Sequence, residues 1–165
     1  MKKLAKALAA VIILTMPLQV SAAMQKGKKA PAQDVWQPAK TPVGGTPWKL
    51  LETTKLNDRT VKDGIIYTKP IFSTAIKALA GKQIKVAGYM MPLDNAAKQK
   101  RFILLAYPPG CPFHMHALPN QYVEVKSLVG VPINETKVHI VTGTLQLTGY
   151  DESGIFYSLV NARVG

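Results

Sequence analysis

Residues 81–93, with the sequence GKQIKVAGYMMPL, decide the kind of fold that this chain can adopt. Large apolar side chains occur there at Ile84, Val86 and Met90, and the residues between them can face solvent. Side chains of an extended chain point alternately to opposite faces, so this period of two predicts a β-strand with one buried face. Such a strand needs further strands beside it to complete a sheet.

Four later segments also show strand patterns. They comprise residues 100–107, 121–126, 138–147 and 155–163, and a turn through residues 151–154 joins the last two. Gly143 interrupts the fourth strand and is a candidate for a β-bulge. Together the five strands predict a mainly β protein of the α+β class, folded as a small five-stranded antiparallel OB-like barrel.

One short helix is expected before the first of these strands. Thr68 is a plausible cap, Pro70 suits the first turn, and Gly81 would end the helix. The apolar face of this predicted helix consists of Ile71, Ala75, Ala78 and Leu79.

The N-terminal part of the sequence has the features of an export signal. Lysines at positions 2, 3 and 6 precede an apolar stretch at residues 7–20 and small residues at 21–23, which predicts a cleavable signal peptide over residues 1–23. Residues 24–47 are rich in Lys, Pro and Ala and predict a flexible leader, and residues 48–165 are expected to form a single domain. No later stretch approaches the ~20 apolar residues of a transmembrane helix, so we expect a periplasmic protein.

The chain is strongly basic, with 21 Lys and Arg residues against 9 Asp and Glu residues. Without the three lysines of the predicted signal peptide, 18 basic residues remain against the same 9 acidic ones, a net charge of +9. Long-range attraction to anionic envelope surfaces is the expected consequence of this charge. Nucleic acid is not an expected partner, because an exported protein does not meet it.

A concentrated set of metal-ligating residue types lies at positions 111–116, with the sequence CPFHMH. It holds the only cysteine and two of the three histidines of the chain. Pro112 suits the second position of a β-turn, which would bring Cys111 and His114 within ~7 Å between Cα atoms. If the chain then runs extended, His114 and His116 project to the same side. Cys111, His114 and His116 are therefore the predicted metal ligands.

Thiolate and imidazole together suit zinc, with copper as the alternative metal. Four further residues are weaker candidate ligands: Met90, Met91, Met115 and His139. The plain alternative is that Cys111 is a small buried hydrophobic residue and the two loop histidines are simply exposed.

Enzymatic activity is not expected. A thiol-disulfide oxidoreductase resolves mixed disulfides with a second thiol, and this chain has only Cys111. No nearby Asp or Asn is present to orient a Cys-His pair, and Glu124 and Asp94 are only generic candidates for a catalytic base. A binding module that uses one face and two loops of the barrel is a non-enzymatic alternative.

The sequence resembles a family of small exported bacterial proteins that is catalogued only as a domain of unknown function. Residues 81–93, followed by Phe-Ile-Leu-Leu at 102–105 and Cys-Pro-Phe at 111–113, are similar to this family. The resemblance implies a periplasmic β-rich domain, sometimes associated with export or uptake systems for transition metals. It also implies a Cys-Pro-x-Cys pair in the loop, whose second cysteine is replaced here by His114.

These observations predict a periplasmic protein that binds zinc or copper for trafficking or homeostasis, with components of envelope metal transport as possible partners. The alternative prediction is a barrel that binds an anionic envelope ligand or a protein partner without catalysis.

Overall fold

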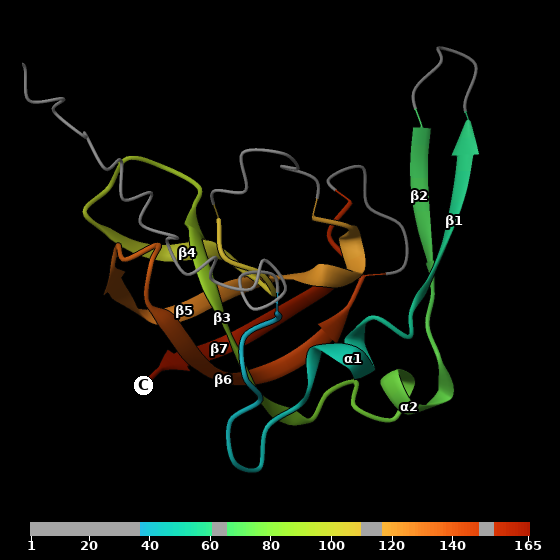
Figure 1. Cartoon of the computed structure of the whole chain (residues 1–165), viewed down its shortest axis with the longest axis horizontal. Coiled ribbons are helices and arrows are strands. Elements are labelled where there is room, and N and C mark those ends of the chain that lie inside the picture. The colour runs from blue at the N-terminus through green and yellow to red at the C-terminus, as the bar shows by residue number, and fades with distance from the viewer. Residues whose placement is uncertain (1–36, 61–65, 110–116, 149–153) are drawn as a thin grey trace, which may run out of the picture. The chain divides into compact units, whose positions relative to one another are not determined.

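A computed structural model describes residues 37–60, 66–109, 117–148 and 154–165 (Figure 1). The elements in chain order are α1 (Trp48–Leu51), β1 (Lys55–Thr60), β2 (Ile66–Ile71), α2 (Thr74–Lys77), β3 (Gln83–Pro92), β4 (Lys98–Leu105), the 3-10 turn η1 (Pro119–Gln121), β5 (Tyr122–Pro132), β6 (Val138–Leu147) and β7 (Tyr157–Val164). None of the helices in these described ranges is long and apolar enough to cross a membrane.

Strands β3 to β7 form a closed barrel in the order β3-β4-β5-β7-β6, and β6 returns to pair with β3. Four of the five neighbouring pairs are antiparallel, as predicted, but β5 and β7 are parallel. The prediction of a wholly antiparallel barrel was therefore wrong. The chain reverses direction at β6 and again at β7, so β7 runs in the same direction as β5 when it comes to lie beside it.

All five predicted barrel strands are present. The fourth matches its predicted bounds, Val138–Leu147, and the third extends beyond its prediction to Pro132. The bulge predicted at Gly143 is confirmed, because the β6–β7 register shifts between Thr142 and Thr144. A Cβ atom at Gly143 would lie 3.1 Å from the Cβ of Leu159, so the absence of a side chain also lets β6 and β7 approach closely.

The barrel interior is filled by the apolar residues that alternate along the strands, as the sequence pattern predicts. Ile84, Val86 and Met90 of β3 are buried there, and α1 adds Trp48 and Leu51 to the same core. Burying each large side chain contributes about 1.5–3 kcal/mol. Hydrophobic packing between α1 and the strands therefore holds the barrel and the preceding segment together.

Strand β3 pairs with two different neighbours along its length. Its residues Gln83 to Tyr89 pair with β6, and Tyr89 to Pro92 pair with β4. Gly88 lies at this change of partner, where an added Cβ would be 2.5 Å from the carbonyl oxygen of Leu105 and 2.7 Å from Cγ of Leu104. Only glycine allows β3 and β4 to approach this closely.

Residues preceding β1 cover the edge of β3 that β4 leaves open. Thr46 donates its backbone N–H to the carbonyl oxygen of Lys85 at 2.7 Å, and Trp48 donates its indole Nε1–H to that of Ala87 at 2.6 Å. These bonds satisfy backbone carbonyl groups that would otherwise lack partners. The buried residue Ala39 bonds in addition to the carbonyl oxygen of Ala106. The packed part of the chain therefore extends N-terminal of Trp48, into residues that composition assigns to the flexible leader.

The helix predicted from Pro70 to the residue before Gly81 is largely wrong. Pro70 and Ile71 belong to β2, which pairs with β1, and α2 spans only Thr74–Lys77. The helix begins later because Ser73, not Thr68, is its N-cap and accepts a hydrogen bond from the backbone N–H of Ile76. The resulting β1–β2 hairpin, which the sequence pattern did not reveal, stands beside the barrel in Figure 1.

We predict that Gly88→Ala lowers the free energy of unfolding by about 1–3 kcal/mol or more, because its Cβ would collide with a backbone carbonyl group that cannot move independently. Gly130→Ala is the matched control. The three atoms nearest to a Cβ there belong to the side chain of Lys98, the closest being its Cβ at 3.0 Å, and none is a backbone atom, so a smaller loss is expected. Urea denaturation of both variants measures the difference, and equal losses would contradict the role given to Gly88.

Candidate functional site

Four of the predicted metal ligands, Cys111, His114, Met115 and His116, lie outside the described residues. Within the described ranges, no group of three or more His, Cys, Asp or Glu side chains lies together in a way that could hold a metal ion. The structure therefore defines the two ends from which the β4–β5 connection leaves the barrel, and not the predicted ligands themselves.

The chain entering this connection is fixed by hydrogen bonds. Ala106 donates its N–H to the carbonyl oxygen of Gln121 at 2.9 Å, and its own carbonyl oxygen accepts from the N–H of Ala39 at 2.8 Å. The hydroxyl of Tyr107 donates to Glu52 Oε1 at 3.3 Å. Burial, and after it the neighbouring Glu52 carboxylate, raises the pKa of Tyr107. Tyr107 therefore remains a neutral hydrogen-bond donor to Glu52 at physiological pH.

The residues that follow the connection, 118–121, are also held by hydrogen bonds. Leu118 donates its N–H to Oε1 of Gln121 at 3.1 Å, and Gln121 returns its own N–H to the carbonyl oxygen of Leu118 at 2.7 Å. Asn120 uses its Nδ2 group to donate to the backbone carbonyl oxygens of Glu52 at 3.2 Å and Thr54 at 3.1 Å. Both ends of the connection are thereby tied to the segment that follows α1.

Asn120 leaves one polar atom without a partner. Its Oδ1 atom is buried and forms no hydrogen bond in the part of the chain that the structure describes. The side-chain amide cannot be turned around to relieve this, because Nδ2 faces two carbonyl oxygens and only a donor can satisfy them. A buried acceptor without a partner costs about 1–3 kcal/mol, so Oδ1 is a place where a water molecule or another donor would bind.

Tyr157 fastens α1 to the barrel end from which this connection leaves. Its hydroxyl oxygen lies 2.7 Å from the carbonyl oxygen of Leu51 and 2.6 Å from Oγ1 of Thr54. A phenol has one proton, so Tyr157 donates to Leu51 and accepts from the Thr54 hydroxyl. Burial raises the pKa of Tyr157 to about 12, and the Thr54 hydrogen bond acts in the opposite direction. The group is a structural anchor rather than an acid or base near neutral pH.

The weaker candidate ligands in the described residues have structural roles. Met90 is buried in the core, whereas the half-buried Met91 points to the other face of β3. His139 is buried, and its Nε2 lies 2.7 Å from the carbonyl oxygen of Asn134. A carbonyl only accepts, so Nε2 is the donor in this bond. This bond attaches His139 to the β5–β6 connection rather than to the β4–β5 connection that carries Cys111.

A second polar cluster lies on the outer side of the barrel around Glu124 of β5. The carboxylate accepts from Nε of Arg101 at 2.5 Å, from Nζ of Lys126 at 3.3 Å and from the hydroxyl of Ser158 at 2.7 Å. The Glu124 side chain is only 4% exposed, whereas those of Arg101 and Lys126 are 62% and 52% exposed. Burial by itself would raise the pKa of Glu124, but the three donors outweigh it and the net shift is downward.

In the sequence, Glu124 is only a generic candidate for a catalytic base, and nothing marks Arg101 or Ser158. Strand alternation places Glu124 on the same face as Lys126, and this is the only part of the cluster that the sequence pattern could have revealed. Arg101 and Ser158 lie on β4 and β7, and pairing between these strands and β5 brings them to Glu124.

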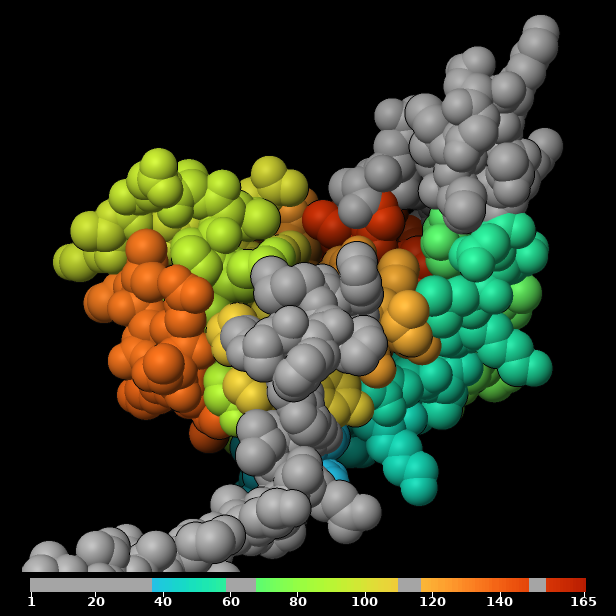
Figure 2. Space-filling model, turned by 45° about the horizontal axis from the view of Figure 1, so that its top comes forward, coloured from blue at the N-terminus to red at the C-terminus, as the bar shows by residue number. Residues whose placement is uncertain are grey.

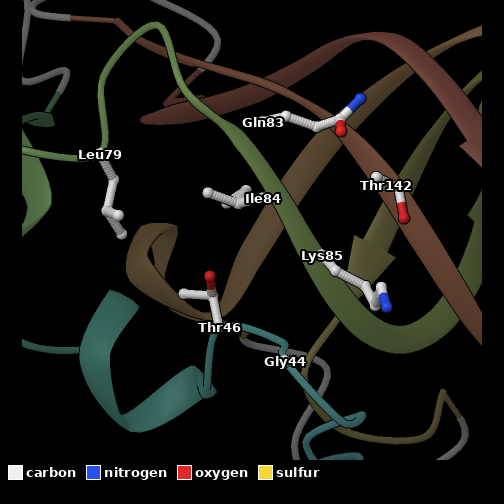
Figure 3. Close-up of a pocket in the computed structure, with 7 residues that line it drawn as sticks. All are labelled: Gly44, Thr46, Leu79, Gln83, Ile84, Lys85 and Thr142. Carbon is white, nitrogen blue, oxygen red and sulfur yellow. The ribbon is translucent and has the colours of Figure 1, made fainter.

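A shallow hollow of about 340 Å³ lies beside the start of β3 (Figure 3). Its lining residues are Gly44, Thr46, Leu79, Gln83, Ile84, Lys85 and Thr142. Lys85 is the only ionisable residue among them, and its Nζ donates to the carbonyl oxygen of Val43 at 3.3 Å. No pair of groups suited to acid-base chemistry or metal binding lines this hollow.

The described residues define a small closed β-barrel of mixed strand direction, with the buried carboxylate of Glu124 on its outer face. Hydrogen bonds tie both ends of the β4–β5 connection to the segment that follows α1. The chain belongs to the family described as "Protein of unknown function (DUF3299)", which it matches over residues 21–163. A crystal structure of a DUF3299 family protein from Pseudomonas aeruginosa is similar, with 27% sequence identity and a TM-score of 0.47. The match covers 58% of this chain and 65% of the other, which is less than two thirds of that protein. No curated protein matches this chain.

We predict that Tyr157→Phe lowers the free energy of unfolding by about 1–3 kcal/mol, because it removes the bond to Leu51 and leaves the buried Thr54 hydroxyl without its acceptor. Tyr107→Phe is the matched control, since its bond to Glu52 is long and partly exposed, and a loss below about 0.5 kcal/mol is expected. Urea unfolding monitored by tryptophan fluorescence measures both values. A loss for Tyr107→Phe as large as that for Tyr157→Phe would contradict the anchoring role.

We also predict that Glu124→Gln lowers the free energy of unfolding by about 1–3 kcal/mol at neutral pH. The folded-state pKa of Glu124 lies below its ordinary value of 4.5, so the ionised carboxylate stabilises the fold fully above that value. This stabilisation is lost as pH falls through the folded-state pKa, and the two proteins should therefore converge in stability in acid. Urea titrations at several pH values measure the difference, with the exposed Glu135→Gln as control. A difference that is independent of pH would rule out the ion pairs as its source.

Proposed function

We propose that this protein is an exported transition-metal-binding protein that carries zinc, or alternatively copper, and hands it on. The observation that carries the proposal is the position of the Cys111, His114 and His116 cluster on a connection whose two ends are both fixed. Ala106 on one side and Asn120 on the other are hydrogen-bonded into the packed structure. Fixing the ends of a loop lowers the conformational entropy that is lost when its ligands assemble around a metal.

The donor chemistry of this residue set fits the proposed metals. One thiolate and two imidazoles are a ligand set of zinc sites, and they leave a fourth position for water or for a donor from a partner. Reduced copper also favours a thiolate ligand. A metal site with an exchangeable fourth position suits transfer of the ion better than permanent storage.

The strand order of the barrel fits a binding role. Numbered from one to five along the chain, its strands lie in the order 1-2-3-5-4, with the third and fifth parallel. We infer an OB-like barrel from this order, a fold that presents ligands on one face and on two loops. The fold by itself does not define the ligand, so the metal proposal depends on the residues of the β4–β5 connection.

Export to the periplasm is part of the proposal and depends on the signal peptide predicted at residues 1–23. An exported lone thiol is exposed to oxidation and to intermolecular pairing unless a ligand occupies it. A bound metal would protect Cys111. Components of envelope metal transport are the proposed partners, because an ion that is carried in this compartment must be delivered to or taken from a transport system.

We predict that residues 24–165 bind about one zinc or Cu(I) ion per chain, and that Cys111→Ser and His114→Ala each weaken binding by at least about tenfold. Affinity should fall as pH decreases, because the thiol and the imidazoles must lose their protons to bind metal. Competition titrations with a chromophoric chelator measure the affinity and the stoichiometry.

Met91→Leu is the control variant, since it removes a thioether from the half-buried end of β3 and should leave the affinity unchanged. Unchanged stoichiometry and affinity in both Cys111→Ser and His114→Ala would refute the proposed site. Loss of binding in Met91→Leu alone would move the site to the end of β3.

A further inference from the structure

Two cations face one another on the outer side of the barrel. Arg101 of β4 and Lys126 of β5 are directly opposite partners in the strand register. Like charges in this position repel and destabilise a strand pair. Glu124 compensates, because its carboxylate accepts from both side chains while it is itself almost completely buried. The buried carboxylate thus holds two exposed cations together at the surface.

More donors remain at this place than the single carboxylate uses. Glu124 accepts from Nε of Arg101, so the two terminal guanidinium nitrogens lie outside that hydrogen bond. Lys98 and Lys100 are also exposed on β4, next to Arg101. The outer side of β4 and β5 therefore carries four cations, and Glu124 is the one carboxylate in these two strands. The excess positive charge would attract an anionic partner.

Exposed apolar residues lie at the edge of this basic area. Leu128 and Val129 are consecutive in β5 and are 50% and 62% exposed. Both are exposed because the strand leaves regular pairing here: the β5–β7 register shifts before Ser127, whose hydroxyl accepts from the N–H of Val129. Gly130 then lies against the side chain of Lys98, which links the apolar pair to the basic residues.

We propose that the surface formed by Lys98, Lys100, Arg101, Lys126, Leu128 and Val129, named here the β4–β5 surface, docks onto an anionic phospholipid bilayer. Cations beside exposed apolar side chains are the combination that binds such a surface, with the charges among the headgroups and the apolar groups at their boundary with the acyl chains. Arg101 contributes a planar fork that can hold a headgroup phosphate through two parallel hydrogen bonds.

Nucleic acid fits this surface less well. Single-stranded nucleic acid requires exposed aromatic side chains on which bases stack. The two aromatic residues of β4 and β5 are Phe102, which is buried in the core, and Tyr122, which is half-buried and donates its hydroxyl to the carbonyl oxygen of Gly154. Soluble polyanions would use the cations but not Leu128 or Val129. The apolar pair therefore distinguishes a bilayer from other anionic partners.

The test measures binding of residues 24–165, in the presence of a metal chelator, to vesicles of phosphatidylcholine with and without phosphatidylglycerol. Binding is expected only with phosphatidylglycerol and should weaken as salt rises. Lys98→Gln combined with Lys100→Gln, and Arg101→Gln by itself, should each reduce the vesicle partition coefficient by about fivefold per charge. Leu128→Ser combined with Val129→Ser should reduce it by about fivefold or more.

Matched controls are available elsewhere on the described surface. Lys77→Gln removes an exposed charge from α2, and Ile71→Ser removes an apolar side chain from β2 that is 53% exposed. Neither control should change vesicle binding. Circular dichroism verifies that each variant is folded, and the Lys98 and Lys100 changes keep the test valid even if Arg101→Gln disturbs the ion pair with Glu124.

Two results would overturn the proposal. Equal losses in the controls and in the variants of the β4–β5 surface would mean that the net charge, including the lysines near the N-terminus, acts without a defined surface. Unchanged vesicle binding in the Leu128 and Val129 variant, together with binding of heparin or single-stranded DNA that depends on Arg101, would assign the cations to a soluble polyanion. The outcome does not depend on the proposed metal site, because the chelator is present throughout.

Discussion

The close approach of β3 and β4 at Gly88 is the constraint on which the rest of the barrel depends. Strand β3 pairs with both β4 and β6, and at Gly88 its backbone lies in contact with the carbonyl group of Leu105. A Cβ atom at position 88 would prevent this contact. Closing the barrel in this way leaves the first half of β3 without β4 on one edge. The chain before β1 then supplies the missing partners through Thr46 and Trp48.

This arrangement also determines where the polar groups lie. Because Trp48 is held against β3, α1 is placed at one end of the barrel, where Tyr157 and Asn120 bond to it and to the residues that follow it. The same end carries the β4–β5 connection, so its flanks share those hydrogen bonds. A backbone hydrogen bond from the N–H of Ile133 to the carbonyl oxygen of Ala97 joins the β3–β4 turn to the loop before β6. These two segments lie side by side at one rim of the molecule (Figure 2).

Sequence reasoning succeeded where one segment carries its own pattern. Strands such as Val138–Leu147 could be predicted because alternation of buried and exposed residues is a local property, and Gly143 marked the bulge for the same reason. The helix from Pro70 failed because pairing of β2 with β1 competes with a local helical pattern and wins. For the candidate site, Cys111 and its neighbouring histidines could be selected from donor type and spacing, although they lie outside the described residues.

By itself, the sequence determined that the protein is mainly β, which residues of the first barrel strand face the core, and that the single cysteine and two of the three histidines are gathered at one place. Only the tertiary structure decided that β5 and β7 are parallel, that Arg101 and Ser158 meet at Glu124, and that the chain before Trp48 completes the barrel edge. The physical reason is the range of the interactions. Alternation and turn preference act between residues close in sequence, whereas these pairings join residues that are far apart and become neighbours only when the barrel closes.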